Sequence, residues 1–236
     1  MNPIVLHHNL GLGDHIICNG LVRSLLNDGK CFTDIYIFAK ERYKKSVDRM
    51  FGDDNRIHII PIPHCDPSYE CSYVNQFIGN NPNLGAFVRA QNGVIDNLIS
   101  MGIVSNFDEG FYACCGIPFE RRWSWFKLNR NTEEENRVLK KLNPSNEKYI
   151  FVHDEPSMGN TVVPENPNNL KIIKNDKEEC IFDMVKIFEN ASEIHCMESS
   201  IKCLIDHLPQ ITCPLYFYNI RSHGLVSKTK KNWIKI

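Results

Sequence analysis

Two short stretches of this sequence combine small residues with an acidic side chain where a strand-like run gives way to a helix-like run. The first is Gly11-Leu12-Gly13-Asp14, which follows the apolar run 4–6 and two histidines, His7 and His8. The second, Glu198-Ser199-Ser200, follows a short strand-like run. Glycine lets a ligand approach the backbone closely, and a helix N-terminus presents unpaired N–H groups. Both junctions are therefore candidate sites for an anionic ligand.

Each junction also has an interpretation that needs no ligand. Asp14 is either a helix cap or a general base that takes a proton from a reacting hydroxyl. Ser199 or Ser200 either caps the next helix or belongs to a phosphate site. His7 and His8 are either strand-end histidines satisfied by the backbone or part of the site.

Basic residues supply candidate partners for a negatively charged ligand. Arg121 and Arg122 lie in a segment dense in aromatic residues, which favours either packing between domains or contact with an anion. Arg221, with His223 nearby, follows the last expected strand and is either a surface arginine or a ligand contact. The C-terminal lysines are either a solvated tail or phosphate contacts; they are Lys228, Lys230, Lys231 and Lys235.

The composition bounds the class of protein. The chain has 236 residues, 42% of them hydrophobic and 23% charged, and its net charge is −1. This suffices for one large domain or two small ones and provides no basic field for nucleic acid. No apolar run approaches the about 20 residues of a membrane span, and Met1-Asn2-Pro3 leads straight into the first strand without a signal peptide. We expect a cytoplasmic protein without a transmembrane segment.

The cysteine pattern argues against a metal site. Ten cysteines are scattered without a CxxC pair, which indicates reduced and mostly buried thiols. His58, His64, Cys65 and Cys71 are close in sequence, but their spacing matches no zinc pattern. We therefore expect no bound metal.

The elements around the two junctions alternate between strand and helix. In the first part of the chain, strands are expected over 4–6, 33–39 and 56–62, with helices over 16–26 and 40–50. After a turn-forming break at 143–146, strands are expected over 148–153, 170–173, 193–196 and 212–218, with helices over 180–189 and 201–208. This order predicts parallel sheets with right-handed crossovers. Ligands bind beyond the carboxyl ends of such strands, which is where both junctions lie.

The break places a domain boundary between an N-terminal domain, 1–143, and a C-terminal domain, 144–236. We expect an α/β protein of two compact Rossmann-like domains, whose parallel sheets face a central cleft where the ligand binds.

Four stretches resemble the GT-B glycosyltransferases, two-domain enzymes that use nucleotide sugars. NLGLGDHIICNGLVRSL resembles the glycine–Asp loop and first helix of heptosyltransferase-type enzymes. FDEGFYACCGIPFERRW, VHDEPSMGN and IHCMESSIKCLIDHL are similar to a related bacterial and viral group of sugar transferases. The chain departs from the heptosyltransferase pattern in being roughly 100 residues shorter than domain lengths predict. It also has Asn19-Gly20 where that type usually has a proline.

The resemblance implies a glycosyltransferase of glycan biosynthesis that moves a hexosyl, deoxyhexosyl or similar group from a nucleotide-diphosphate sugar to a glycan or other acceptor hydroxyl. Asp14 would be the general base, with His15 beside it, in an acceptor-side N-terminal domain, and the anomeric centre would invert. The implied donor and phosphate contacts are Gly11, Gly13, His153, Asp154, Ser157, Glu198, Ser199, Ser200, Arg221 and His223. Helix dipoles and basic residues would neutralise the diphosphate, so the resemblance implies no metal or other cofactor.

Two rival interpretations stay open. A nucleotide-binding GT-B-like protein with a regulatory or degenerate role would need no catalysis, and the short chain favours it. An NAD(P)-linked enzyme would use the first loop, but GLGDH lacks the third glycine of GxGxxG and no acidic residue clearly ends the second strand.

Overall fold

The polypeptide forms two compact α/β units, Met1–Asn129 and Arg130–Ile236. The computed structural model describes residues 2–29, 32–63, 67–220 and 226–236. Each unit contains one sheet, in the strand orders β3-β2-β1-β4 and β6-β5-β7-β8-β9, and every strand pair in both is parallel. The predicted α/β class with two parallel sheets is confirmed.

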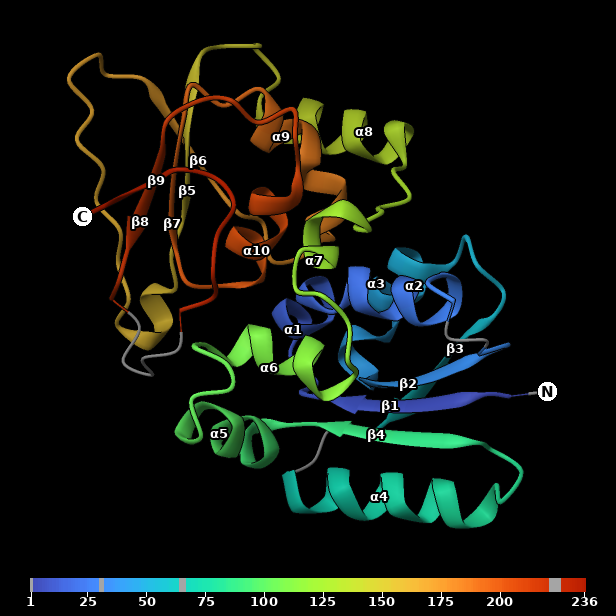
Figure 1. Ribbon diagram of the computed structural model, residues 1–236. Helices are drawn as coiled ribbons and strands as arrows, with labels where there is room; N and C mark the ends of the chain where they lie inside the picture. The colour runs from blue at the N-terminus through green and yellow to red at the C-terminus, as the bar shows by residue number, and fades with distance from the viewer. Residues whose placement is uncertain (1, 30–31, 64–66, 221–225) are drawn as a thin grey trace. The chain divides into compact units, whose positions relative to one another are not determined.

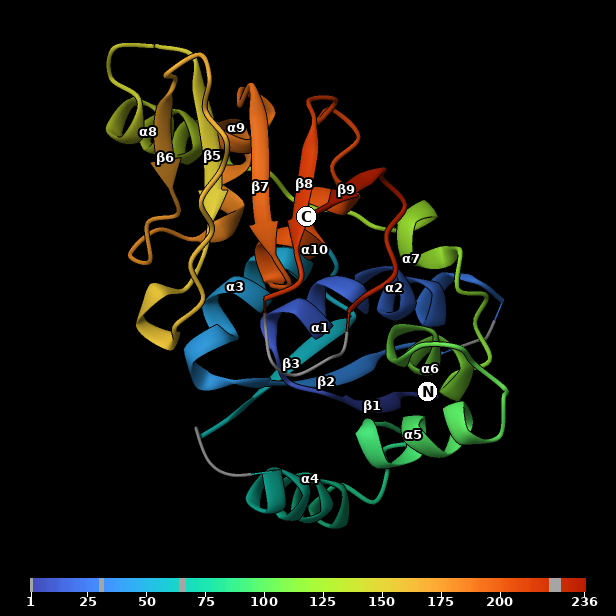
Figure 2. The ribbon, with the colours of Figure 1, turned by 90° about the vertical axis from the view of Figure 1, so that its left-hand side faces the viewer.

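In unit 1, helices cover both faces of the four-stranded sheet. The strands are β1 (Ile4–His8), β2 (Ile35–Lys40), β3 (Ile57–Ile62) and β4 (Ala86–Ala90), and the helices are α1 (Leu12–Ile17), α2 (Asn19–Asn27), α3 (Glu41–Phe51), α4 (Pro67–Asn80), α5 (Asn92–Ser100), α6 (Phe107–Cys114) and α7 (Arg121–Ser124). Figures 1 and 2 show α1, α2 and α3 on one face and α4 on the other. In the strand order, β2 and β3 lie on one side of β1 and β4 lies on the other, so the topological switch point is between β1 and β4.

Successive side chains of the unit 1 strands point to opposite faces of the sheet and pack into an apolar layer on each face. Val5 and Phe38 pack with Val74 of α4 on one face. Ile4 and Leu6, which point the other way along β1, are at most 1% exposed. The sheet is therefore a rigid, doubly covered base for the loops at its carboxyl edge.

The amphipathic run predicted as one helix over 16–26 is two helices that break at Cys18. Cys18 has φ −80° and ψ 0°, and it ends α1 and precedes α2. The buried hydroxyl of Tyr112 fixes this break, because it donates to the Ile17 carbonyl at 2.8 Å and accepts from the Leu21 N–H at 3.1 Å. A continuous apolar stripe carries no signal for such a break.

Strand β4 was not predicted from the sequence. It pairs with β1 along its whole length, from Ile4↔Ala86 to His8↔Ala90. Ala86 and Phe87 are exposed and the strand is only five residues long, so it lacks the apolar alternation that marks a half-buried strand.

Unit 2 has helices on one face of its five-stranded sheet (Figure 1). The strands are β5 (Tyr149–His153), β6 (Lys171–Lys174), β7 (Glu193–Met197), β8 (Leu215–Tyr218) and β9 (Trp233–Lys235), and the helical elements are α8 (Thr132–Leu142), η1 (Pro156–Met158), η2 (Ile181–Met184), α9 (Val185–Glu189) and α10 (Ser200–His207). Figures 1 and 2 place α8, α9 and α10 together on that face. The switch point of this sheet lies between β5 and β7.

By packing, the chain divides earlier than the sequence break at 143–146. Arg130 donates to Glu135 of α8 at 2.5 Å and to Glu189 of α9 at 2.6 Å, which ties these two helices together. Helix α8 therefore belongs to unit 2, and the polar break is a turn within that unit. The acceptor and donor roles assigned to the two halves stay predictions.

The C-terminal lysine segment is ordered, although the side chains of Lys230 and Lys235 are exposed to solvent. Trp233 is buried and pairs with Leu215, so the C-terminal segment adds β9 to the sheet. The Asp206 carboxylate accepts the backbone N–H groups of Lys230 and Lys231 at 2.9 and 3.0 Å. One tryptophan and one buried acceptor thus order a segment whose composition alone indicates solvent exposure.

Two further findings concern only the described part of the chain. No helix there is long and apolar enough to cross a membrane. None of the eight cysteines described there forms a disulfide with another of them.

Candidate functional site

The loop after β1 leaves the sheet at the switch point of unit 1. Gly11 has extended dihedral angles (φ −73°, ψ 149°) and is the N-cap of α1, so Gly13 already lies in the helix. Oδ2 of Asp14 accepts the N–H of Gly11 at 3.2 Å. A Cβ at Gly11 would lie 2.6 Å from that oxygen, so a larger residue there would displace the Asp14 side chain. Asp14 therefore does cap the helix.

Capping leaves Asp14 able to act as a base. Its other oxygen, Oδ1, accepts no hydrogen bond from any described residue. Burial raises the pKa of the half-buried Asp14 to about 6, against the opposing effects of the Gly11 N–H and the Lys40 charge. A carboxylate with a pKa near the working pH is ionised often enough, and basic enough, for proton abstraction.

Three histidines form a buried, uncharged layer behind the loop. Burial lowers the pKa of His7 to about 3 and that of His8 to about 4, and it holds the pKa of His15 well below its usual range. The rings of His8 and His15 meet edge to face with centroids 4.6 Å apart. His15, predicted beside Asp14 as a catalytic group, is 0% exposed, and neither of its ring nitrogens has a hydrogen-bond partner among the described residues.

Polar side chains from the neighbouring strands complete this edge of unit 1. The side-chain amide nitrogen of Gln91, directly after β4, lies 2.9 Å from Nε2 of His7. Lys40, at the end of β2, places Nζ 2.6 Å from Oε1 of Glu70. Sequence reasoning missed these residues, Gln91 because β4 was not predicted and Lys40 because it was read only as the start of a polar helix.

In unit 2, the loops after β5 and β7 leave adjacent strands at the switch point. The register pairs His153 with Cys196, so the two loops start side by side. Asp154 accepts from Lys174 Nζ at 2.8 Å, and Nδ1 of His153 lies 2.8 Å from Oδ1 of Asn175. Ser157, in the short helix η1, is exposed. The two predicted loops therefore do meet at one edge of this sheet.

Ser199 is the N-cap of α10, as the capping interpretation predicts. Its Oγ accepts the N–H of Lys202 at 3.2 Å, and Ser200 is the first residue of the helix. Glu198 turns into the protein, where Oε2 lies 2.6 Å from Lys202 Nζ and Oε1 accepts from the Ser227 hydroxyl at 2.8 Å. Lys202 and Ser227 were not predicted. The spacing of four residues between Glu198 and Lys202 was a readable signal, but the role of Ser227 had none.

The basic residues predicted to contact an anion lie in different environments. Arg122 is fully buried, donates to Asp108 at 2.5 Å and lies over the Trp123 ring, so the packing interpretation describes it and an anion has no access to it here. Arg121 is partly exposed and donates to Asp28 at 2.9 Å. Arg221 and His223 lie outside the described residues.

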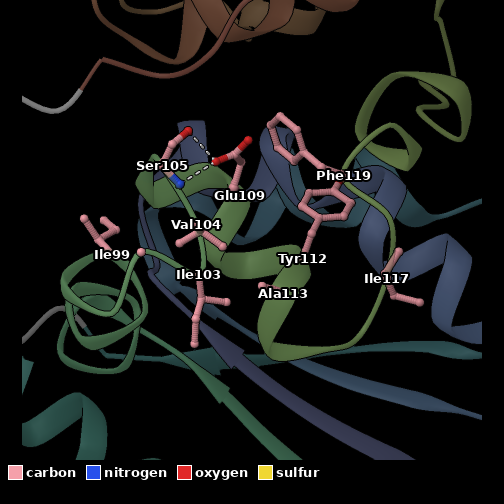
Figure 3. A pocket seen from close by; sticks show the side chains of 10 residues that line it. Ile99, Ile103, Val104, Ser105, Glu109, Tyr112, Ala113, Ile117 and Phe119 are labelled. Atoms are coloured by element: carbon pink, nitrogen blue, oxygen red, sulfur yellow. Dashed lines mark hydrogen bonds between the residues drawn. The ribbon is translucent and has the colours of Figure 1, made fainter.

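A cavity of about 630 Å³ lies elsewhere in unit 1, against one face of α6. Figure 3 shows Val104, Tyr112 and Phe119 around it, with Glu109 accepting from the Ser105 N–H and hydroxyl, both at 2.8 Å. The lining is mostly apolar and does not include Asp14. The candidate base is therefore not part of this cavity.

No group of three or more His, Cys, Asp or Glu side chains is arranged to hold a metal ion within the described ranges. Two members of the weak sequence cluster, His64 and Cys65, lie outside those ranges.

Comparisons with known proteins identify the fold. No family model matches the sequence, and a search of curated proteins gave no match. A solved glycosyl transferase family 9 structure from Veillonella parvula matches 92% of this chain and 80% of its own, with a TM-score of 0.57 and 8% identity. The E. coli ADP-heptose lps heptosyltransferase II matches 92% of this chain and 84% of its own, with a TM-score of 0.53 and 10% identity. The likeness confirms the GT-B-type fold that the motifs implied.

Proposed function

We propose that this protein is a glycosyltransferase that moves a sugar from a nucleotide-diphosphate donor to an acceptor hydroxyl. The observation that carries the proposal is Asp14, a carboxylate of raised pKa at the switch point of a sheet whose fold matches solved glycosyltransferases. Its capping bond holds one oxygen in place, which orients the other.

In this proposal Asp14 is the general base. Oδ1 takes the proton of the acceptor hydroxyl, and the acceptor oxygen attacks the anomeric carbon. The bond between that carbon and the donor phosphate oxygen breaks, and the nucleoside diphosphate leaves with its electron pair. A single displacement of this kind inverts the anomeric centre. General-base catalysis of this type contributes roughly two to four orders of magnitude in rate.

The donor would bind at the carboxyl edge of the unit 2 sheet. The start of α10 at Ser199 and Ser200 offers N–H groups and a positive helix end to the diphosphate, and the loop from Asp154 to Gly159 starts beside it. We propose that these groups neutralise the leaving diphosphate without a metal, and that the reaction takes place in the cytoplasm on a glycan or similar acceptor. A hexosyl or deoxyhexosyl group is the proposed cargo.

The proposal is tested by Asp14→Asn, which keeps an oxygen to cap the helix but removes the base. We expect turnover to fall by about 10²–10⁴-fold, with little change in melting temperature and in donor affinity. Asp28→Asn, which removes a partly exposed carboxylate that pairs with Arg121, is the matched control and should retain activity. Equal losses of stability and activity in Asp14→Asn would mark this residue as a cap alone.

A thermal-shift panel of nucleoside diphosphates, nucleotide sugars and NAD(H) separates the rival functions. Stabilisation by one nucleoside diphosphate, together with transfer or slow hydrolysis of its sugar donor, is expected for a transferase. Binding without either reaction would instead indicate a non-catalytic nucleotide-binding protein, and stabilisation by NAD(H) alone would indicate a dehydrogenase-type enzyme.

A further inference from the structure

The first turn of α10 contains a lysine where protein interiors rarely accept one. The side chain of Lys202 is 1% exposed. Lysine is almost never fully buried unless its charge is paired, because removing an ammonium group from water is costly. The position of Lys202, three residues after the N-cap Ser199, puts this charge directly behind the proposed diphosphate site.

Lys202 is enclosed by partners from three parts of unit 2. Its Nζ lies 2.6 Å from Oε2 of Glu198, 3.3 Å from the hydroxyl of Ser227 and 3.4 Å from the Ser227 carbonyl. The same nitrogen stands 4.8 Å from the centre of the Phe217 ring. These contacts account for the full donor capacity of an ammonium group.

Glu198 is held as firmly as its partner. Its Oε1 accepts the hydroxyl of Ser227 at 2.8 Å and the Ser227 N–H at 3.4 Å, while Oε2 faces Lys202. Both carboxylate oxygens are therefore directed into the protein. We call Glu198, Lys202 and Ser227 the clasp.

Without Lys202, Glu198 would work against a diphosphate. It immediately precedes the N-cap of α10, so its charge stands at the helix end that attracts anions. An uncompensated carboxylate within several ångströms of phosphate oxygens repels them strongly in a partly buried setting. The helix N-terminus can favour an anion only if this charge is cancelled or turned away.

We propose that Lys202 is a positioning residue of the donor site: through the clasp it turns the Glu198 carboxylate inward and cancels its charge, so that the start of α10 attracts the donor diphosphate. This inference rests on the proposed function. It also gives Glu198 a role behind the site in place of the direct donor contact that the family resemblance implies.

The test is a double-mutant cycle on the full chain with nucleoside diphosphates as probes. Wild type, Lys202→Met, Glu198→Gln and the double variant are titrated calorimetrically with ADP, GDP, UDP and CDP. Lys186→Met, which removes a lysine that contacts Asn136 of α8, is the matched control for loss of one positive charge from unit 2. Melting temperatures are measured alongside, so that loss of structure is separated from loss of affinity.

We expect Lys202→Met to weaken binding of the recognised diphosphate by about tenfold or more, because the Glu198 carboxylate then loses the ammonium group that lies 2.6 Å from its Oε2. Glu198→Gln should bind as tightly as wild type or more tightly, and the double variant and Lys186→Met should stay within about twofold of wild type. Should Lys202→Met fail to fold, Lys202→Gln, which keeps a donor for Ser227, replaces it in the same comparison.

Two results would overturn the proposal and leave the proposed function standing. One is unchanged affinity when Lys202 is replaced in a folded protein. The other is a tenfold loss in Glu198→Gln, which would show that Glu198 itself contacts the donor, or a tenfold loss in the double variant alone, which would show that Lys202 acts independently of Glu198. If folded wild type binds none of the four diphosphates, the proposed function fails and this inference fails with it.

Discussion

At the scale of single residues, Asp14 combines two roles that its position in the sequence presents as alternatives. One oxygen closes the first turn of α1 through the Gly11 N–H, while no described residue bonds to the other. Burial destabilises the ionised form of the carboxyl, and this raises its pKa to about 6. Asp14 can therefore cap the helix with Oδ2 and act as a base with Oδ1, because a carboxylate has two oxygens.

This pKa predicts the acidic limb of the pH–rate profile. A general base works only when deprotonated, so kcat/KM should fall about tenfold per pH unit below a pKa of about 6 and level off above it. The measurement is the initial rate of sugar transfer at subsaturating donor between pH 4.5 and 8. The residual activity of Asp14→Asn should lack this limb. A limb that persists in the variant would belong to another group.

At the scale of elements, the close approach of α2 to α7 depends on one missing side chain. A Cβ at Gly20 would lie 2.1 Å from the carbonyl oxygen of Arg121 and 2.9 Å from its carbon. Backbone atoms cannot yield as a flexible side chain can, so α7 would have to move. The glycine that departs from the heptosyltransferase pattern is therefore a packing requirement of this chain.

Gly20→Ala should lower the free energy of unfolding by about 1–3 kcal/mol, because the new methyl group forces two packed helices apart. Gly79→Ala is the control: this glycine lies in α4 and a Cβ there would meet nothing within 4 Å. That substitution should be neutral or stabilise by about 0.5–1 kcal/mol. Urea denaturation measures both. Equal effects at the two positions would contradict the close approach.

Which elements the sequence reveals depends on whether their contacts are local. Apolar periodicity and turn residues are local signals, and they were sufficient for β1, β2, β3, α3 and most of unit 2. The break at Cys18 depends on the distant hydroxyl of Tyr112, and β9 depends on Trp233 entering a sheet. The clasp likewise needs Ser227, which lies 29 positions after Glu198. Contacts between residues so far apart in sequence depend on the fold, and the residues next to them in sequence give no pattern that predicts them.

At the scale of the whole molecule, the two units have different strand orders, and the candidate sites at their switch points differ in electrostatic character. Each sheet has a switch point beside its first strand, and each candidate loop leaves that point. In unit 1 the edge is backed by uncharged histidines and carries a carboxylate of raised pKa. In unit 2, Lys202 lies in the first turn of α10 behind the edge of the sheet and is paired with Glu198. These settings suit proton abstraction and anion binding respectively.

The histidine layer of unit 1 predicts a molecule that loses stability in acid. His7 and His8 titrate at about 3 and 4 when folded, and His15 lies well below its usual 6.5, so all three stay neutral in the fold. Unfolding lets each take up a proton below pH 6.5, whereas Asp14, raised to about 6, gives one up. The unfolded chain thus binds a net two more protons between about pH 6 and 4. Each proton contributes about 1.4 kcal/mol per pH unit.

We therefore expect the free energy of unfolding to fall by roughly 3 kcal/mol per pH unit as the pH drops from 6 towards 4. Urea denaturation curves at half-unit intervals measure this slope. His15→Leu should reduce it by about 1.4 kcal/mol per pH unit, because one proton fewer is taken up on unfolding. The variant should not lose stability at pH 7, since neither ring nitrogen of His15 is hydrogen-bonded to a described residue. An unchanged slope in His15→Leu would show that this imidazole is not held neutral by the fold.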